Sequence, residues 1–409
     1  MARSRGPRDV LSPSAGVETE EPASTHFFVA SSGAAVTLVD NGLIMLEGIS
    51  AQCKSPAERN YRMAASKRIG VAVVGLGGIA ERAVLPAFRR SKKTKLVALV
   101  SGDERKARRL AAKFGARDYY TYDDYVLCLN HPQVNAVFIA TTNGTHAEYT
   151  LRAAASGKHV LCEKPMANTV EECHQMVDAC RANNVRLMIA YRKYFEPASR
   201  ALKKLVTSGK LGRLKILHSA FTIYLPPGKA TPAWHFDRKQ AGGGSLVDVG
   251  VYCINTARWL LDKDPVEASA YAWTLDPARF SEIEENISFQ LKFPEGVVLQ
   301  ASSSFGAAQA SFLHVHGEKG WAALDPAYAY DEERRLFGKI GGRWFEKKFK
   351  AMDEFVLELD AFADSIRRGR DPEPDGYEGL KDVAVMQAIY RSARDNRPSP
   401  IYLAGIGPP

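Results

Sequence analysis

A charged pair stands where a strand of this chain is expected to end. Glu163 and Lys164 follow the strand-like residues 159–162 and precede Pro165. Charged side chains at the end of a buried strand are disfavoured unless they pair or perform a function. Pro165 stiffens the backbone that leaves the strand. We therefore predict that Glu163 and Lys164 belong to the active site of an enzyme.

Asp248 and Tyr252 could act together with Lys164. They share one face of a helix expected to follow the glycine-rich residues 242–244 and to reach about residue 261. A neutral tyrosine, with a pKa of about 10, is a poor acid or base at neutral pH. A nearby Lys164 ammonium would favour the tyrosinate and lower that pKa, and the pair could then exchange a proton with a substrate hydroxyl. The alternative is that Tyr252 packs its ring and Asp248 caps the helix.

A glycine-rich turn indicates which cofactor serves these side chains. It stands between an expected strand, residues 69–74, and an expected helix, residues 80–89. Its first glycine permits a tight turn, its second lets the backbone approach a pyrophosphate, and the helix N-terminus attracts the phosphates. Glycine-rich turns also occur for structural reasons, but the strand–turn–helix context and the βαβ units that follow favour dinucleotide binding. The residues of this motif are Gly75, Gly77, Gly78, Ile79 and Ala80.

The next strand, residues 95–100, bears on the choice between NAD and NADP. An acidic residue directly at its end would bind the ribose hydroxyls of NAD and repel a 2′-phosphate. Here the strand ends in Ser101, and Lys106 follows one helical turn later. This pattern favours NADP(H) over NAD(H). The alternative is a solvated helix start with Asp103 as its N-cap.

Further candidates follow the expected strand 136–140. Thr141, Asn143 and His146 come directly after it, and ligands of open α/β sheets bind at such carboxyl ends. We predict that these residues contact the cofactor together with Glu163 and Lys164. His146 could equally be a residue of the helix start.

The order of elements predicts an α/β protein of two domains. Residues 67–190 alternate strands and helices and predict a dinucleotide-binding Rossmann domain. Residues 191–405 predict an α+β domain with an open, mostly antiparallel sheet, which could pack on a copy of itself and form a homodimer or homotetramer. Trp234, in a loop of this domain, could stack on a sugar or on an aromatic ring. The expected strands there are 216–223, 266–272, 283–293, 297–305 and 312–316, and the expected tail helices are 353–369 and 377–396.

Composition excludes several other classes. With 409 residues, 45% of them hydrophobic and 25% charged, the chain is typical of a globular protein, and no apolar run approaches the roughly 20 residues of a membrane span. The net charge of +9 comes without an aromatic or helix-turn-helix pattern, so we expect no nucleic-acid partner. Six cysteines without metal-ligand spacing predict reduced thiols, no metal and a cytoplasmic location. Residues 1–66 lack a clear period and are expected to be a disordered tail or to precede a natural start at Met63.

Taken together, these motifs resemble the Gfo/Idh/MocA oxidoreductase family from about residue 68 to residue 403. They are the glycine-rich turn, Glu163-Lys164-Pro165, Tyr191-Arg192, the segment from Gly242 to Tyr252, and residues 379–392. Many members carry histidine where this chain has Tyr252. The tyrosine is similar to the branch of glucose–fructose oxidoreductase, NADP-dependent xylose dehydrogenase and dimeric dihydrodiol dehydrogenase. Thr142 departs from the proline usual in the family's cofactor loop.

The resemblance implies hydride transfer between NADP(H) and a sugar or polyol carbon. It implies that Lys164 lies near the reacting hydroxyl, that Tyr252 is the acid/base, and that Asp248 orients substrate or catalyst. Ser101 and Lys106 would lie near the 2′-phosphate, and Tyr191 and Arg192 would line the junction of cofactor and substrate. Two alternatives remain: a trans-dihydrodiol dehydrogenase acting on aromatic diols, and a non-catalytic NAD(P) sensor on the same fold.

Overall fold

The computed structural model describes residues 68–228 and 231–407, together with four short strands before them. These strands form two antiparallel pairs, Phe28–Val29 (β1) with Ala35–Val36 (β2) and Leu38–Val39 (β3) with Gly42–Leu43 (β4). The predictions of a disordered tail and of a start at Met63 concern residues that lie otherwise outside this description. In the part of the chain that is described, no helix has the length and apolar character needed to cross a membrane.

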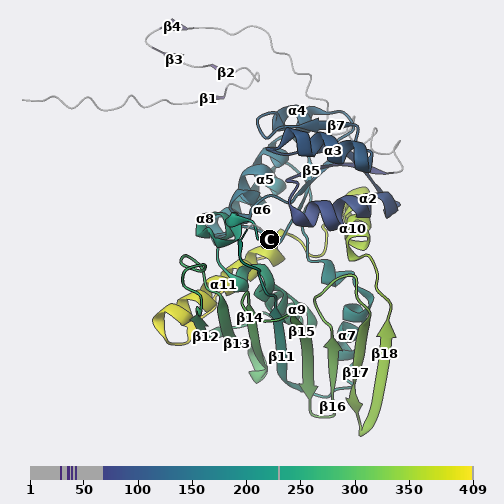
Figure 1. Cartoon of the computed structure of the whole chain (residues 1–409), viewed down its shortest axis with the longest axis vertical. Helices are drawn as coiled ribbons and strands as arrows, with labels where there is room; N and C mark the ends of the chain where they lie inside the picture. Colours follow the sequence, from purple (N-terminus) through teal and green to yellow (C-terminus); the bar gives the residue numbers. More distant parts are fainter. Residues whose placement is uncertain are drawn as a thin grey trace, which may run out of the picture. The chain divides into compact units, whose positions relative to one another are not determined.

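The first sheet is parallel and confirms the predicted Rossmann fold. Its strands stand in the order β10-β9-β8-β5-β6-β7, in the upper half of Figure 1. Helices cover both of its faces, so every residue of β5 is buried, as the continuous apolar run predicts. The strands are Ile69–Val74 (β5), Thr94–Val100 (β6), Asp118–Tyr120 (β7), Ala136–Ile139 (β8), His159–Cys162 (β9) and Leu187–Ile189 (β10).

Short connections join these strands to their helices. Two of the connections carry the glycine-rich turn and Thr141, because β5 and β8 are neighbours whose carboxyl ends meet at one edge of the sheet. The chain order reverses at this pair, and ligands of open α/β sheets bind at such a position. The helices are Leu85–Arg90 (α2, preceded by a π-helical turn Ala80–Val84), Glu104–Phe114 (α3), Tyr125–Asn130 (α4), His146–Ala155 (α5) and Val170–Ala182 (α6).

The second sheet has nine strands in the order β18-β17-β16-β15-β11-β14-β13-β12-β19. Only β11 and β14 run parallel, so the predicted open, mostly antiparallel sheet is confirmed. Five of its long strands match the predicted ones. The strands are Leu214–Thr222 (β11), Glu267–Trp273 (β12), Asn286–Lys292 (β13), Val298–Ser304 (β14), Ala310–Gly317 (β15), Gly320–Asp325 (β16), Arg334–Ile340 (β17), Arg343–Phe349 (β18) and Ser399–Pro400 (β19).

Three strands of the second sheet, β16 to β18, were not predicted from the sequence. β16 is short and rich in alanine, and the two strands that follow carry many charges. β18 forms an edge of the sheet, and none of its residues is fully buried, so it lacks the apolar alternation that reveals a strand. Its cations also discourage pairing with another chain, which is a common feature of edge strands.

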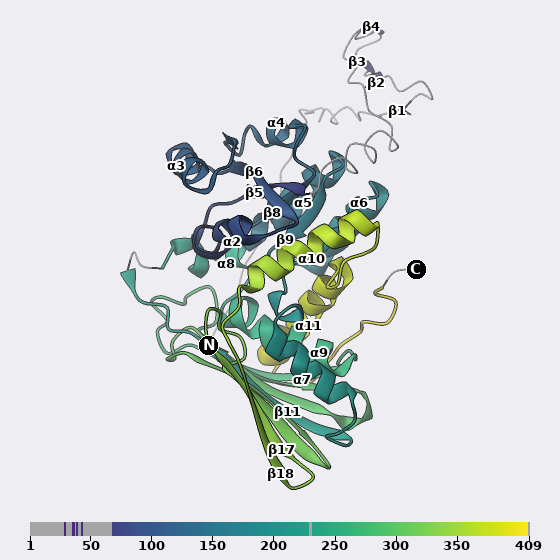
Figure 2. The ribbon, with the colours of Figure 1, turned by 90° about the vertical axis from the view of Figure 1, so that its right-hand side faces the viewer.

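One face of the second sheet is covered by helices. In Figure 2, Pro197–Thr207 (α7), Val251–Leu261 (α9) and Gly376–Asp395 (α11) lie along it. Helix Glu354–Arg368 (α10) follows the second sheet in the chain but packs against α2 and β6 of the first. Phe355, Leu359 and Phe362 of α10 belong to the same core as Val71 of β5. The two sheets are thereby linked by more than the connection at residue 190.

Candidate active site

A cavity of about 860 Å³ lies at the carboxyl ends of β5, β8 and β9 and extends to the helix-covered side of the second sheet. Most of the predicted site residues line it. From the first sheet come Gly75, Gly77, Gly78, Ile79, Lys106, Thr141, Asn143, Glu163 and Lys164; from the later part of the chain come Arg192, Trp234, Asp248 and Tyr252. Residues that are distant in sequence, such as Lys164 and Asp248, therefore meet in one cavity.

Lys164 is the centre of the polar contacts in this cavity. Its Nζ donates to Asp248 Oδ1 at 2.8 Å and to the Asp248 carbonyl oxygen at 2.6 Å. The same nitrogen lies 5.1 Å from the ring centroid of Tyr252. Asp248 belongs to the π-helical turn Leu246–Gly250, which continues into α9, and Tyr252 lies in the first turn of α9. The predicted helix therefore brings both side chains to the lysine.

Pairing keeps Lys164 and Asp248 charged. Burial alone would lower the pKa of Lys164, but the charge and hydrogen bond of the Asp248 carboxylate outweigh it and raise that pKa. Burial raises the pKa of Asp248, but the charge and hydrogen bond of Lys164 prevail, so its pKa lies below the usual value. The pair is therefore an ammonium and a carboxylate at neutral pH.

The prediction that Lys164 lowers the pKa of Tyr252 holds for the lysine charge itself, but the net shift of that pKa is upward. Tyr252 is only 8% exposed, and burial raises the pKa of its phenol above the usual value. Arg192 lowers it as well, and Glu163 raises it. Sequence reasoning considered one neighbouring charge and missed the cost of burying a phenolate, so Tyr252 is a neutral phenol in this structure.

The glycine-rich turn fits a dinucleotide pyrophosphate. Gly75 has φ +90°, and an added Cβ would lie 2.5 Å from the Ala140 carbonyl oxygen, so only glycine suits this turn. A Cβ on Gly77 would meet nothing within 4 Å, so its backbone borders open space within the cavity. The residues present can therefore hold the pyrophosphate of NAD(P) against the backbone at the start of the first helix.

At the start of α3, the structure shows both the predicted N-cap at Asp103 and a Lys106 side chain that borders the cavity. Asp103 is the N-cap, since its side chain accepts from the backbone N–H of Lys106 at 2.9 Å. The Lys106 side chain nevertheless lines the cavity, and its Nζ lies 3.5 Å from Glu81 Oε2. Ser101 is buried, does not line the cavity, and accepts from the Asp103 N–H at 3.1 Å. Contact between Ser101 and a 2′-phosphate therefore has no support in this geometry.

Tyr191 lies outside the cavity, which corrects its predicted place between cofactor and substrate. Its side chain is 1% exposed, and burial together with the Asp382 carboxylate raises the pKa of its phenol. Ala80 is also buried, in the packing position expected for the last residue of the motif. The sequence pattern places Tyr191 directly after a strand, but it does not show that the Tyr191 side chain points into the core.

His146 likewise does not line the cavity. It begins α5, is 0% exposed, and its Nδ1 and Nε2 lie 3.0 Å and 3.3 Å from the carbonyl oxygens of Pro165 and Thr141. The structure therefore favours the alternative of a helix-start residue. His146 thus links the loop at Thr141 to Pro165 and holds together two segments that border the cavity.

Burial of His146 predicts a loss of stability in acid. Desolvation, helped by the nearby Lys164 charge, lowers its pKa to about 4, so the unfolded chain binds a proton below pH 6.5 that the folded chain refuses until about pH 4. Stability should fall across this window by about 3 kcal/mol from this one group. His146→Asn should remove that part of the loss, as denaturant unfolding at pH 7 and pH 4.5 would show. Equal losses in both proteins would contradict the assignment.

Several residues that line the cavity were not among the predicted site residues. Arg82 follows the glycine motif, but a cation in a helix is ordinarily read as solvated. His235 lies in the turn Ala233–Phe236 and, in its protonated form, would help to lower the pKa of Asp248. Its Nδ1 lies 3.1 Å from the Pro232 carbonyl oxygen, so the tautomer that donates there leaves Nε2 as an acceptor. Tyr122, Gln309, Tyr330 and Glu332 also line the cavity.

Comparison with known proteins agrees with this fold. Residues 69–191 match the family described as "Oxidoreductase family, NAD-binding Rossmann fold", and residues 199–323 match the "GFO/IDH/MocA C-terminal domain". The D-xylose 1-dehydrogenase [NADP(+)] of Haloarcula marismortui is 31% identical over 79% of this chain and 90% of its own length. The 1,5-anhydro-D-fructose reductase of Ensifer adhaerens is 32% identical over 78% of this chain and 95% of its own.

Solved structures give the same result. The aldose-aldose oxidoreductase of Caulobacter crescentus is 36% identical, with a TM-score of 0.78 over 82% of this chain and all of its own. Levoglucosan dehydrogenase, at 22% identity and a TM-score of 0.73, shares the fold. Fold and site thus define an NAD(P)-binding oxidoreductase that acts on CH–OH groups. The chain belongs to the GFO/IDH/MocA oxidoreductase family.

Proposed function

We propose that this protein is an NADP(H)-dependent oxidoreductase that moves a hydride between the nicotinamide and a sugar carbon, C1 of a pyranose. The observation that carries the proposal is the contact of Lys164 with both Asp248 and Tyr252 in a cavity that begins at a dinucleotide-binding turn. Relatives named for D-xylose, 1,5-anhydro-D-fructose and aldoses support a sugar as substrate.

The side chains divide the work on the substrate hydroxyl. The cofactor, when bound, accepts or donates the hydride. Lys164 keeps its proton and places a positive charge beside the oxygen that changes protonation, while Asp248 fixes the direction of the ammonium. Tyr252 gives its phenol proton to a carbonyl oxygen during reduction and becomes a phenolate; during oxidation the phenolate takes the proton from a hydroxyl and becomes the neutral phenol again. His235 and Trp234 offer an acceptor and a ring to the remaining hydroxyls and the face of a pyranose.

The preference for NADP(H) can be tested at Lys106. We expect Lys106→Ala to raise the Kd for NADPH by about tenfold or more, because a charge-assisted hydrogen bond contributes about 1.5–3 kcal/mol. The Kd for NADH should change little. Arg109→Ala is the matched control, since Arg109 also pairs with Glu81 but does not line the cavity. Fluorescence titration with each cofactor would show this, and equal losses for NADPH and NADH would contradict a 2′-phosphate contact.

Substrate class can be determined with the same sample. NADPH or NADH is titrated first by fluorescence, and a panel of aldoses, polyols and aromatic diols is then followed at 340 nm with the matching oxidised or reduced cofactor. Turnover of an aldose with NADP(H) would support the proposal. Turnover confined to aromatic diols would replace it with a trans-dihydrodiol dehydrogenase. Tight binding without any turnover would favour a sensor or an enzyme that never releases its cofactor.

The open face of the second sheet supports a homodimer or homotetramer. Tyr271 on this face is 65% exposed, and its ring stacks on Trp273. Contiguous exposed aromatic residues are typical of protein contacts. We propose that a second copy covers this face, and light scattering during gel filtration tests it: a monomer at micromolar concentration would argue against the proposal.

Buried thiols at all five described cysteines accord with a reducing, cytoplasmic location.

A further inference from the structure

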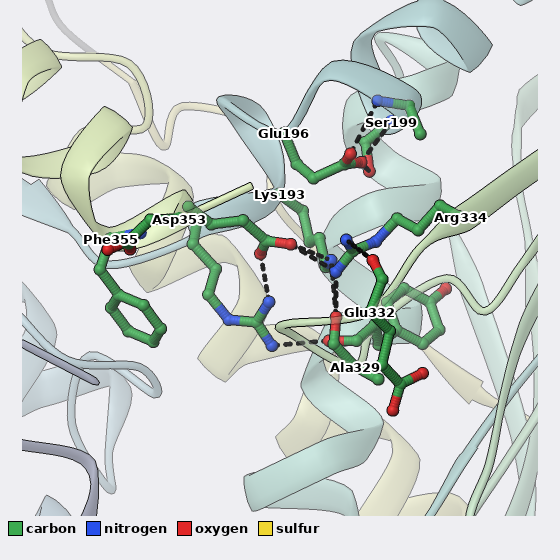
Figure 3. Close-up of polar contacts among 12 residues, drawn as sticks. Lys193, Glu196, Ser199, Ala329, Glu332, Arg334, Asp353 and Phe355 are labelled. Atoms are coloured by element: carbon green, nitrogen blue, oxygen red, sulfur yellow. Dashed lines mark hydrogen bonds and ion pairs between the residues drawn. The ribbon is translucent and has the colours of Figure 1, made fainter. Parts of the chain in front are cut away.

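Three cations surround one buried carboxylate behind the cavity. Arg192, Lys193 and Arg334 all form ion pairs with Glu354, and each of these four side chains is at most 5% exposed. We call this group the Glu354 cluster. Lys193 and Arg334 reach it from different parts of the chain, beside Ala329 and the start of α10 (Figure 3). Buried charges are costly, so such a group requires either close pairing or a function.

The pairing inside the Glu354 cluster is unequal. One carboxylate faces three basic side chains, and Lys193 is the one that loses its proton most readily. Burial lowers the pKa of Lys193 to about 7, and the Glu354 charge offsets only part of this decrease. Arg192 and Arg334 keep their protons because guanidinium is protonated at any ordinary pH. The cluster therefore leaves positive charge on the side that faces the cavity.

Arg192 is the member of the cluster that lines the cavity. Its Nη1 donates to Glu354, and its Nη2 donates to the Tyr328 carbonyl oxygen at 2.6 Å. Both terminal nitrogens thus have partners in the protein, which holds the guanidinium in one orientation. Its Cζ lies 5.1 Å from the ring centroid of Tyr252, the same distance as Lys164 Nζ.

We propose that Arg192, anchored by Glu354, is a positioning residue that acts through Tyr252. With Lys164 it places a second fixed positive charge beside the phenol and stabilises the tyrosinate that proton transfer produces. This inference rests on the proposed function in assigning Tyr252 to the proton transfer. The cofactor contact predicted for Arg192 stays a prediction beside this role, because Arg192 lines the cavity and its guanidinium has further N–H groups.

The surroundings of Tyr252 make such a charge necessary. The ring centroid of Phe221 lies 5.5 Å from that of Tyr252, in an edge-on arrangement, and the ring centroid of Tyr328 lies 5.9 Å away. Burial among these rings raises the pKa of the Tyr252 phenol. The charged groups that act on the phenol are Lys164 after β9, Glu163 beside it, and Arg192. Asp248, on the preceding helical turn, is neutralised by Lys164. Of the two cations, Arg192 lowers the pKa more than Lys164 does, and Glu163 opposes both.

The experiment measures the ionisation of Tyr252 directly. The full-length protein is prepared with 3-fluorotyrosine at position 252, and the ¹⁹F resonance is followed as pH rises, without substrate. We expect Arg192→Met to raise the phenol pKa by at least one unit, and Glu354→Gln to raise it less by releasing the guanidinium. Arg192→Lys should restore part of the shift because it keeps the charge. Arg335→Met removes an exposed cation of β17 and serves as the control, with no expected shift.

Kinetics provide the second measurement. In the unlabelled protein, Arg192→Met should reduce kcat/KM for oxidation at pH 7 at least tenfold, and the difference should shrink as pH rises. In a Tyr252→Phe background the same change should have little further effect. An unchanged ¹⁹F titration, or a loss confined to the KM for cofactor, would overturn the proposal. If no sugar is turned over, the proposed function fails, while the ¹⁹F titration still decides whether Arg192 controls Tyr252.

Discussion

Lys164→Ala is expected to lower kcat by about 10³-fold or more while leaving NADPH affinity nearly unchanged. Positioned proton transfer contributes roughly 10²–10⁴-fold to enzymatic rates, and Lys164 supplies the positive charge beside Tyr252 and the reacting oxygen. The variant removes the cation beside Tyr252 and leaves the Asp248 carboxylate without its partner at 2.8 Å. Both changes disfavour charge development at the reacting oxygen. The backbone turn that holds the pyrophosphate does not involve this side chain.

Steady-state and single-turnover kinetics at saturating cofactor would measure this loss. Lys210→Ala is a suitable control because that lysine is exposed and remote from the cavity lining. Lys164→Arg keeps a cation but cannot reproduce the compact ammonium contact with Asp248, so its activity should remain low. Turnover of Lys164→Ala within a few-fold of the native rate would remove Lys164 from the mechanism and the proposed function with it.

Asp382→Ala is expected to cost about 3 kcal/mol of stability, at the lower end of the roughly 3–5 kcal/mol seen when a buried ion pair loses one partner. Asp382 in α11 is 0% exposed and accepts from Arg258 Nη1 at 2.6 Å and from Asn255 Nδ2 at 2.7 Å. Both donors belong to α9. Arg258 would keep Asp264 at 2.6 Å as a partner, so the loss should not reach the upper end.

Denaturant unfolding with unchanged m-value would measure the effect. Asp382→Asn keeps a hydrogen-bonding side chain without the charge and should lose less stability than the alanine variant. Because α9 also carries Tyr252, the alanine variant should lose activity at temperatures below its unfolding midpoint. A melting curve equal to that of the native protein would show that Arg258 is satisfied by its remaining partners alone.

Local patterns revealed much of the first sheet and of the cofactor turn. The run before Gly75 is continuously apolar because β5 is covered on both faces, and such a run marks a central parallel strand. The turn at residue 75 has a positive φ, which glycine adopts far more readily than other residues. The glycine in the sequence therefore indicated the turn. Asp248 and Tyr252 are one helical turn apart, so their common face followed from helix geometry alone.

Other features depend on contacts that no spacing encodes. β17 and β18 are strands because each pairs with a neighbour. The side chains of β18 are largely exposed, and the buried positions of β17 include Arg334 and Gly338, so neither strand shows an apolar alternation. α10 was recognisable as an amphipathic helix, but its apolar face could suit either sheet, and only the folded chain shows it against β6. Tyr191 and His146 stand at strand or helix ends, yet both side chains point inward.

The sequence by itself indicated the Rossmann fold, the glycine-rich turn, and Lys164, Asp248 and Tyr252 as candidates, which the structure brings together in one cavity. Each of these motifs is read within one strand, turn or helix, where backbone geometry limits the arrangement. Only the tertiary structure decided the electrostatics of the site. The ionisation of Tyr252 depends on its burial and on Arg192, which Glu354 holds from 162 residues further along the chain. Burial and charge both act through space, so they become defined only when distant segments have packed together.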